Sequence, residues 1–159
     1  MTTEALKPGS PIEVHLKSLI LYQEKGIAII LLEGPGGHWG LPILAKASEV
    51  ASIATSLQGE EPKRPLTHDL IAGIIQKARG HVLHVLIDIL EEPLCHGIIA
   101  IDWDGREMDF DSRPSDAISL AIRAHVPIYV SPSVVARGAI PFDQDRWSEE
   151  VEKHPKLIN

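Results

Sequence analysis

The sequence predicts an α+β fold, a single domain in which a mixed β-sheet of about six to seven strands packs with three to four helices. Two observations predict it. Strand-like and helix-like apolar patterns follow one another along the chain as three strands, two helices, three strands, one helix and a further strand. The 159 residues, 44% of them hydrophobic, can bury one core and leave little room for a second.

The first half of the chain is predicted to form three strands and then two helices. Apolar residues alternate or run continuously over three segments of strand length, 12–22, 26–32 and 39–44. They follow helical spacing over residues 47–57, where Glu49 falls in the first turn, and again from Thr67 to about Arg79. Thr67 is the expected N-cap of this second helix, and Gly80 is its expected end.

The second half is predicted to add three strands, a buried helix and a final strand. The strand-like segments are 82–90, 97–103, 106–110 and 127–130. The helix is expected to begin within a residue of Arg113, with Pro114 in its first turn and Ser112 as its cap. A strand, a helix and another strand in this order can form a parallel crossover, so the sheet is expected to be mixed. Ser131 is expected to cap a short last helical turn.

One domain is expected over residues 12–140, with an N-terminal tail over 1–11 and a charged segment over 141–159 that forms either a surface helix or a loose tail. No apolar run approaches the roughly 18 residues that span a bilayer, and the start of the chain lacks a secretory signal pattern. A cytoplasmic protein without membrane contact is therefore expected. The single cysteine, Cys95, fits this compartment and is interpreted as a buried small apolar residue.

The charge of the chain is concentrated in one segment. The net charge of −7 argues against general nucleic-acid binding, which needs clustered lysine and arginine side chains. Residues 85–116 hold nine acidic side chains and two arginines, which gives −7, so the rest of the chain is balanced. This concentration indicates either a solvated face or a carboxylate cluster that binds divalent cations.

The segment 111–116, Asp-Ser-Arg-Pro-Ser-Asp, forms a polar corner between a strand and a helix. Asp109 and Asp111 are two residues apart, so on a strand their carboxylates point to one face. With Asp116 one helical turn further on, they could bind Mg²⁺ or Mn²⁺ through oxygen ligands. Alternatively, Asp111 and Asp116 accept hydrogen bonds from the helix N-terminus and pair with Arg113, which would make the corner structural.

A second polar cluster, Arg-Pro-Leu-Thr-His-Asp over residues 64–69, stands at the entrance to the other helix. Histidine is the residue type suited to proton transfer near neutral pH, so His68 could act as a general acid or base, or as a metal ligand. The alternative is a capped helix start with an exposed histidine. If the two helix entrances meet in space, their histidine, arginine and aspartate side chains line one pocket, and this is the arrangement we expect.

Four short motifs occur in order along the chain. They are Leu-Pro-Ile at 41–43 followed by Glu49, Arg-Pro-Leu-Thr-His-Asp-Leu at 64–70, Asp-Ser-Arg-Pro-Ser-Asp-Ala-Ile at 111–118, and Pro-Ile-Tyr-Val at 127–130. Together they resemble the bifunctional nuclease domain family over about residues 12–140. The resemblance implies hydrolysis of phosphodiester bonds in RNA or DNA. Matched motif by motif, it implies these site residues: Glu49, His68, Asp69, Asp111, Arg113, Ser115 and Asp116.

The leading hypothesis is a nuclease that acts on RNA or DNA with a divalent cation, Mg²⁺ or Mn²⁺, held by Asp109, Asp111 and Asp116. The expected catalytic residues are His68, Asp69, Asp111, Arg113 and Asp116. The expected substrate-binding residues are Arg64, Ser115 and Glu49. The alternative is a non-catalytic, oligomeric regulatory or interaction module in which the aspartate-rich corners only cap helices. In both cases a homodimer is expected, because the helices are apolar enough to form a subunit interface.

Overall fold

The computed structural model describes residues 9–59, 62–91 and 94–141, which form one α+β domain. The strands within these residues are β1 (Ile12–Tyr22), β2 (Ile27–Glu33), β3 (Trp39–Lys46), β4 (Gly80–Glu91), β5 (Leu94–Trp103), β6 (Arg106–Ser112), β7 (Ile128–Val130) and β8 (Ile140–Pro141). The α-helices are α1 (Ala47–Leu57), α2 (Thr67–Lys77), α3 (Pro114–Ala124) and α4 (Pro132–Gly138). The predicted fold class is confirmed.

All eight described strands belong to one mixed sheet in the order β6-β5-β4-β7-β1-β2-β3-β8. The pairing of β4 with β7 is parallel, and the other pairings are antiparallel. Since β6 is antiparallel to β5 and β5 to β4, strand β6 also runs parallel to β7, and α3 connects the two as predicted. The strand count is higher than predicted because β8, with two residues, is too short to show a periodic apolar pattern.

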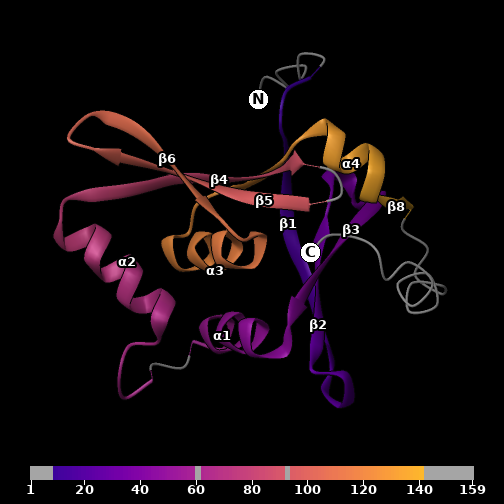
Figure 1. Cartoon of the computed structure of the whole chain (residues 1–159), viewed down its shortest axis with the longest axis horizontal. Coiled ribbons are helices and arrows are strands. Elements are labelled where there is room, and N and C mark those ends of the chain that lie inside the picture. Colours follow the sequence, from indigo (N-terminus) through magenta and orange to yellow (C-terminus); the bar gives the residue numbers. More distant parts are fainter. Residues whose placement is uncertain (1–8, 60–61, 92–93, 142–159) are drawn as a thin grey trace.

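The sheet is strongly twisted, and Figure 1 shows β4, β5 and β6 running across the direction of β1, β2 and β3. Helices α1, α2 and α3 lie on one side of the sheet and α4 on the other (Figure 1). The main core lies beneath α1 and α3, where Ile30, Ile53, Val85 and Ile118 are fully buried. The helices that carry polar clusters are therefore gathered on one face of the molecule.

Close packing of α3 on β5 fixes the position of its N-terminus. Gly97 on β5 faces Ala117 on α3, and a Cβ at Gly97 would lie only 2.6 Å from the Ala117 Cβ. Real Cβ atoms do not approach so closely, so a side chain at position 97 would push the helix away from the sheet. The start of α3 is thus held directly against the end of β6.

The prediction that Thr67 caps α2 is wrong by one residue. Thr67 is the first helical residue, and Leu66 occupies the N-cap position. The backbone N–H of Leu66 donates to Asp69 Oδ2 at 2.9 Å, so the carboxylate of Asp69 completes the helix start instead of a threonine hydroxyl. The helix ends at Lys77 and β4 begins at Gly80, where the sequence predicted the stop.

The prediction that Ser112 caps α3 is also wrong. Arg113 is the N-cap residue, and no side-chain cap is formed there. Ser112 lies on β6, and its hydroxyl donates across the sheet to the carbonyl of Gly97 at 3.0 Å. The cap predicted for α4 is confirmed, because Ser131 Oγ accepts a hydrogen bond from the backbone N–H of Val134.

No helix in the described part of the chain is long and apolar enough to cross a bilayer. The predicted tail or helix over residues 141–159 lies outside the described residues, apart from Pro141 in β8. The N-terminal tail before residue 9 lies outside them as well.

Candidate active site

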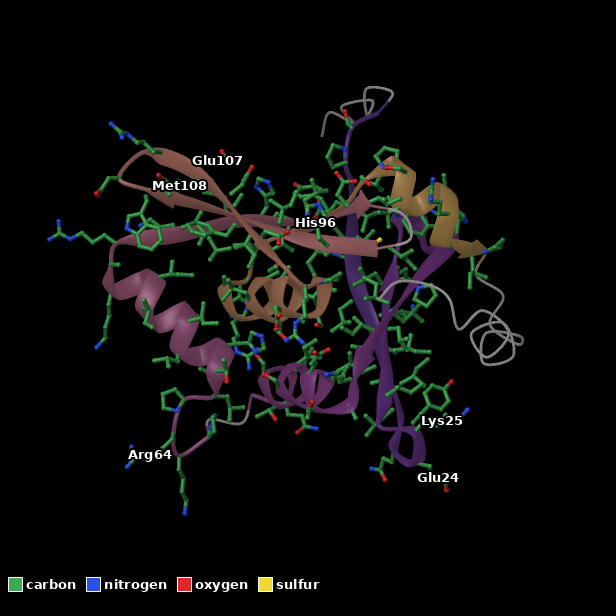
Figure 2. All side chains as sticks on the ribbon, in the orientation of Figure 1. Glu24, Lys25, Arg64, His96, Glu107 and Met108 are labelled. Atoms are coloured by element: carbon green, nitrogen blue, oxygen red, sulfur yellow. The ribbon has the colours of Figure 1, made fainter. Side chains whose placement is uncertain are left out.

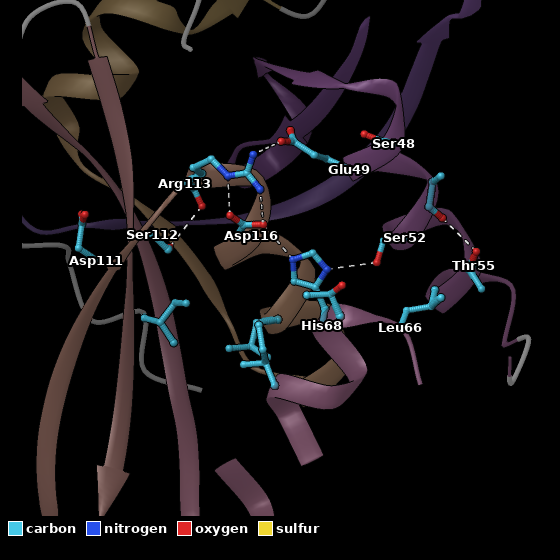
Figure 3. A pocket seen from close by; sticks show the side chains of 15 residues that line it. Ser48, Glu49, Ser52, Thr55, Leu66, His68, Asp111, Ser112, Arg113 and Asp116 are labelled. Carbon is cyan, nitrogen blue, oxygen red and sulfur yellow. Dashed lines mark hydrogen bonds and ion pairs between the residues drawn. The ribbon is translucent and has the colours of Figure 1, made fainter. Parts of the chain in front are cut away.

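The entrances of α2 and α3 meet the first half of α1 around one pocket with a volume of about 790 Å³. Figure 3 looks into this pocket and shows Glu49 and Ser52 from α1, His68 from α2, and Arg113 and Asp116 from the start of α3. The two polar clusters singled out in the sequence are therefore in direct contact, and the prediction that the two helix entrances meet is confirmed.

His68 bridges two helices inside the pocket. Its Nε2 lies 2.9 Å from Asp116 Oδ1, and its Nδ1 lies 3.2 Å from Ser52 Oγ. The side chain is only 12% exposed. A histidine held by a carboxylate at one ring nitrogen and a hydroxyl at the other has a fixed orientation and can exchange a proton at the second nitrogen.

Asp116 is held as a carboxylate. Arg113 clamps it with two hydrogen bonds, from Nε to Oδ2 at 2.6 Å and from a terminal nitrogen to Oδ1 at 3.0 Å. Burial raises the pKa of Asp116, but the hydrogen bonds from Arg113 and His68 outweigh it, so the pKa lies below its usual value. Asp116 therefore stays ionised at neutral pH and can stabilise a protonated His68.

Arg113 also links α3 to α1 through Glu49. The other terminal nitrogen of Arg113 donates to Glu49 Oε1, while Glu49 Oε2 accepts from the Ser115 hydroxyl at 3.2 Å and from the backbone N–H of Lys46 at 3.0 Å. The hydrogen bond to Asp116 is the main reason why the pKa of Arg113 is raised. The hydrogen bonds described use three of the five guanidinium N–H groups, and the side chain lines the pocket and is 60% exposed.

A second arginine, Arg123, joins the three helices behind the pocket. It is 7% exposed and donates to Asp69 on α2, to the backbone carbonyl and hydroxyl of Ser52 on α1, and to the carbonyl of Ser119 on α3. Burial raises the pKa of Asp69, but the hydrogen bonds from Arg123 and the N–H of Leu66 outweigh this effect. The pKa therefore lies below its usual value, and Asp69 is ionised. A continuous polar chain thus runs from Asp69 through Arg123, Ser52, His68 and Asp116 to Arg113 and Glu49.

Comparison with known proteins shows the family of this chain. The model of the bifunctional nuclease domain matches residues 29–143. The chain belongs to the bifunctional nuclease domain family. Two relatives from Mycobacterium tuberculosis, of strains CDC 1551 and H37Rv, are each 36% identical to it over 156 residues, and both are described as uncharacterised proteins. The alignments cover 92% of this chain and 93% of each relative.

The family match begins inside β2, whereas the folded domain begins earlier. Strand β1 lies before the matched residues, and it pairs with β2 on one side and β7 on the other. Removal of β1 would therefore separate the two halves of the sheet. The bifunctional nuclease domain of this chain includes β1 as a central strand.

The cation site predicted for this bifunctional nuclease domain is not assembled. Asp109 and Asp111 lie on β6 opposite Ala100 and Ile98, so both point away from the sheet face that carries α3 and Asp116. Asp111 is 74% exposed and accepts a hydrogen bond from His96 at 2.7 Å, on that far face. In Figure 3, Asp111 stands apart from the network around His68.

The residues present do not fit a resident divalent cation. Within the described ranges, no group of three histidine, cysteine, aspartate or glutamate side chains could hold a metal ion. Of the three carboxylates that line the pocket, Glu49 and Asp116 are already bonded to Arg113, and Asp111 is bonded to His96. A guanidinium occupies the place that a cation would need.

Three further predicted site residues have different positions from those expected. Asp69 is bonded to Arg123 and the start of α2, and it is not among the residues that line the pocket. Ser115 is 5% exposed and orients Glu49. Arg64 lies on the exposed loop before α2 and does not line the pocket; Figure 2 shows its position at the edge of the molecule.

Sequence reasoning missed Ser52 and Arg123. Ser52 lies mid-helix in no motif, and nothing in its neighbours distinguishes it from Ser48 or Ser56. Arg123 did carry a signal, because a spacing of seven residues from Asp116 places both side chains on the same face of a helix. The prediction for Cys95 is confirmed, since the thiol is buried and burial raises its pKa to about 11.

Proposed function

We propose that this bifunctional nuclease domain hydrolyses phosphodiester bonds of RNA or DNA in the pocket between α1, α2 and α3. The observation that carries the proposal is the contact of His68 with both Asp116 and Ser52 beside the exposed Arg113. The family match supports the same reaction class. No membrane-spanning helix is present among the described residues, and the expected cytoplasmic location stays a prediction.

Each group has a distinct role in the proposed reaction. His68 is the general base and acid, and it moves the proton at Nδ1, the ring nitrogen that faces away from Asp116. Asp116 is a positioning residue that holds the ring and offsets its positive charge after protonation. Arg113 has two N–H groups beyond its bonds to Asp116 and Glu49, and these bind the charged oxygens of the phosphate.

The reaction proposed for this pocket does not use the Mg²⁺ or Mn²⁺ that was expected from the sequence. No step of the proposed reaction passes through a metal ion, because Glu49 and Asp116 are bonded to Arg113 and Asp111 is bonded to His96. The proposed reaction is therefore expected to proceed in EDTA. Loss of all cleavage in EDTA, with recovery on adding Mg²⁺ or Mn²⁺, would contradict this part of the proposal.

The exposed guanidinium of Arg113 gives the first test. The purified full chain and Arg113→Gln are assayed on end-labelled single-stranded RNA and DNA, with Mg²⁺, with Mn²⁺ and with EDTA. Loss of the phosphate donors is expected to lower kcat/KM by about 10²- to 10³-fold. Arg106→Gln, which removes an exposed arginine at the start of β6, is the matched control and should leave the rate unchanged. Equal cleavage by Arg113→Gln and the wild type would contradict the proposal.

A second candidate function, a non-catalytic oligomeric interaction module, is favoured by the exposed apolar face of α2. Leu70, Ile71 and Ile74 on this helix are 55%, 41% and 56% exposed. Side chains of this size gathered on one helix mark an interaction surface in a protein of this kind. We propose that a second copy of the chain covers this face, which makes the protein a homodimer.

Light scattering after gel filtration tests the homodimer. The wild type is expected to elute with the mass of two chains and Ile74→Glu with the mass of one, because a buried unpaired carboxylate opposes association. Met108→Glu, at an apolar residue on β6 that is 46% exposed, is the control and should stay dimeric. A wild-type protein that elutes as a single chain would rule the homodimer out.

A further inference from the structure

Ser52 contacts His68, but the proposed function gives its hydroxyl no chemical role. It is half-buried on α1 and lines the pocket, and its hydroxyl lies 3.2 Å from His68 Nδ1 and 3.0 Å from a terminal nitrogen of Arg123. Its backbone carbonyl accepts a second hydrogen bond from the same arginine nitrogen. The Ser52 hydroxyl is thus the group through which His68 Nδ1 contacts the rest of the protein.

The donors and acceptors around Ser52 fix the direction of these hydrogen bonds when His68 is neutral. An arginine side chain can only donate, so Ser52 Oγ accepts from Arg123. The single hydroxyl hydrogen is then available to His68 Nδ1, which acts as the acceptor. The ring carries its own hydrogen on Nε2 and donates it to the carboxylate of Asp116.

This order of hydroxyl, imidazole and carboxylate is the arrangement that activates a serine. The base is in hydrogen-bond reach of the hydroxyl, and a third group orients the base. Arg123, which is 7% exposed, places a positive charge beside Oγ and stabilises the negative charge that develops when the proton leaves. Two other hydroxyls of this pocket wall donate to backbone carbonyls, that of Thr55 to Ala51 and that of Ser112 to Gly97.

We propose that Ser52 is the nucleophile of this site and that the reaction passes through a covalent phosphoseryl intermediate. The inference rests on the proposed phosphodiesterase function and names its attacking group. Because serine is the nucleophile, the reaction has two displacements at phosphorus. A reagent that stops after the first displacement leaves an adduct on the serine, which can be observed without turnover.

The two steps conserve atoms and protons. In the first, Ser52 Oγ forms a bond to phosphorus, its proton passes to His68 Nδ1, and the bond to the leaving alcohol breaks. The leaving oxygen takes that proton and departs as an alcohol. In the second, His68 Nδ1 takes a proton from water, the hydroxide bonds to phosphorus, the bond from Ser52 to phosphorus breaks, and the proton returns to Oγ. The products are an alcohol and a phosphate monoester.

A fluorophosphonate ester tests the nucleophile without a nucleic acid. Attack by Ser52 on its phosphorus expels fluoride and leaves a stable adduct, which intact mass spectrometry detects and peptide mapping assigns to a residue. The full-length wild type is expected to be labelled once, on Ser52. Ser52→Ala should not be labelled, and His68→Ala should be labelled at least about 10²-fold more slowly because the base is absent.

Two variants keep this test independent of folding. Ser56→Ala removes a hydroxyl one helical turn further along α1, outside the pocket, and should be labelled and should cleave like the wild type. Ser52→Thr retains the hydroxyl and should regain part of the labelling that Ser52→Ala loses. If Ser52→Ala is unstable by thermal unfolding, Ser52→Thr and the site of labelling in the wild type decide the question.

The outcomes separate this inference from the proposed function. Nucleic-acid cleavage that is equal in the wild type and a folded Ser52→Ala, without label on Ser52, would overturn the inference and leave the nuclease proposal standing. Label on Ser52 without cleavage of any nucleic acid would overturn the nuclease proposal and support Ser52 as a nucleophile. Absence of both label and cleavage would overturn both.

Discussion

Replacing His68 with alanine is expected to lower kcat/KM for nucleic-acid cleavage by about 10²- to 10⁴-fold, the usual contribution of a general acid and base. The substitution removes the group between Asp116 and Ser52, so no side chain at this position can take up or release the proton of the reaction. The rate constant is measured on end-labelled RNA and DNA with the wild type and variant prepared in parallel. Activity that survives at the wild-type level would contradict the assignment of His68.

Added imidazole separates a chemical role of His68 from a structural one. Truncation to alanine leaves space for a small base between two intact partners, so free imidazole is expected to restore part of the lost rate in His68→Ala. It should have no effect on the wild type. His81→Ala, at an exposed histidine on β4 outside the pocket, is the matched control and should keep full activity. A large loss without any rescue, together with a lowered melting temperature, would indicate a structural role.

Arg123→Met is expected to destabilise the protein by about 3–5 kcal/mol, because it leaves a buried network with one partner removed. The guanidinium is 7% exposed, and it satisfies Asp69 and Ser52 as well as the carbonyl of Ser119. Methionine fills a similar volume to arginine but cannot form any of these hydrogen bonds. Urea unfolding followed by circular dichroism measures the change in the free energy of unfolding.

A double-mutant cycle isolates the ion pair within this effect. Asp69→Asn removes the charge that Arg123 neutralises, so the double variant Arg123→Met with Asp69→Asn is expected to lose less stability than the sum of the two single variants. Arg106→Met, at an exposed arginine, should change stability by no more than about 0.5 kcal/mol. Additive effects of Arg123→Met and Asp69→Asn would show that the two side chains act independently.

Local patterns sufficed to predict most elements because the apolar side chains that define these patterns supply most of the buried core. Strand β1 and helix α1 have the predicted bounds, and α3 begins at Pro114, next to the predicted position. Strand β8 could not be predicted, because its two residues are recruited only by pairing with β3. Thr67 and Ser112 have residue types that favour caps. At α2 the local hydrogen bond from Leu66 N–H to Asp69 takes the place of a threonine cap, and at α3 the Ser112 hydroxyl bonds across the sheet to Gly97.

The residues of the site could be predicted where polar clusters stand at the starts of helices. They could not be predicted where the direction of a side chain depends on packing. The shared face of Asp109 and Asp111 follows from the strand period, and the structure agrees with it. Which face that is cannot be deduced from β6, since its residues up to Asp111 are exposed and show no alternation in burial. Packing of α3 on β5 decides it, and Asp111 takes no part in the hydrogen bonds of Asp116.

Helix α2 has a looser attachment than the other helices that form the pocket, and this links activity to local stability. Among its side chains only Ile75 is buried, and its first turn is held by the bonds of His68 and Asp69 to α3. Segments with little buried apolar area open with a free energy well below that of global unfolding. Each opening event would withdraw His68 from Asp116. A molecule bound across His68 and Arg113 would oppose this opening, so ligand binding and the docking of α2 are thermodynamically coupled.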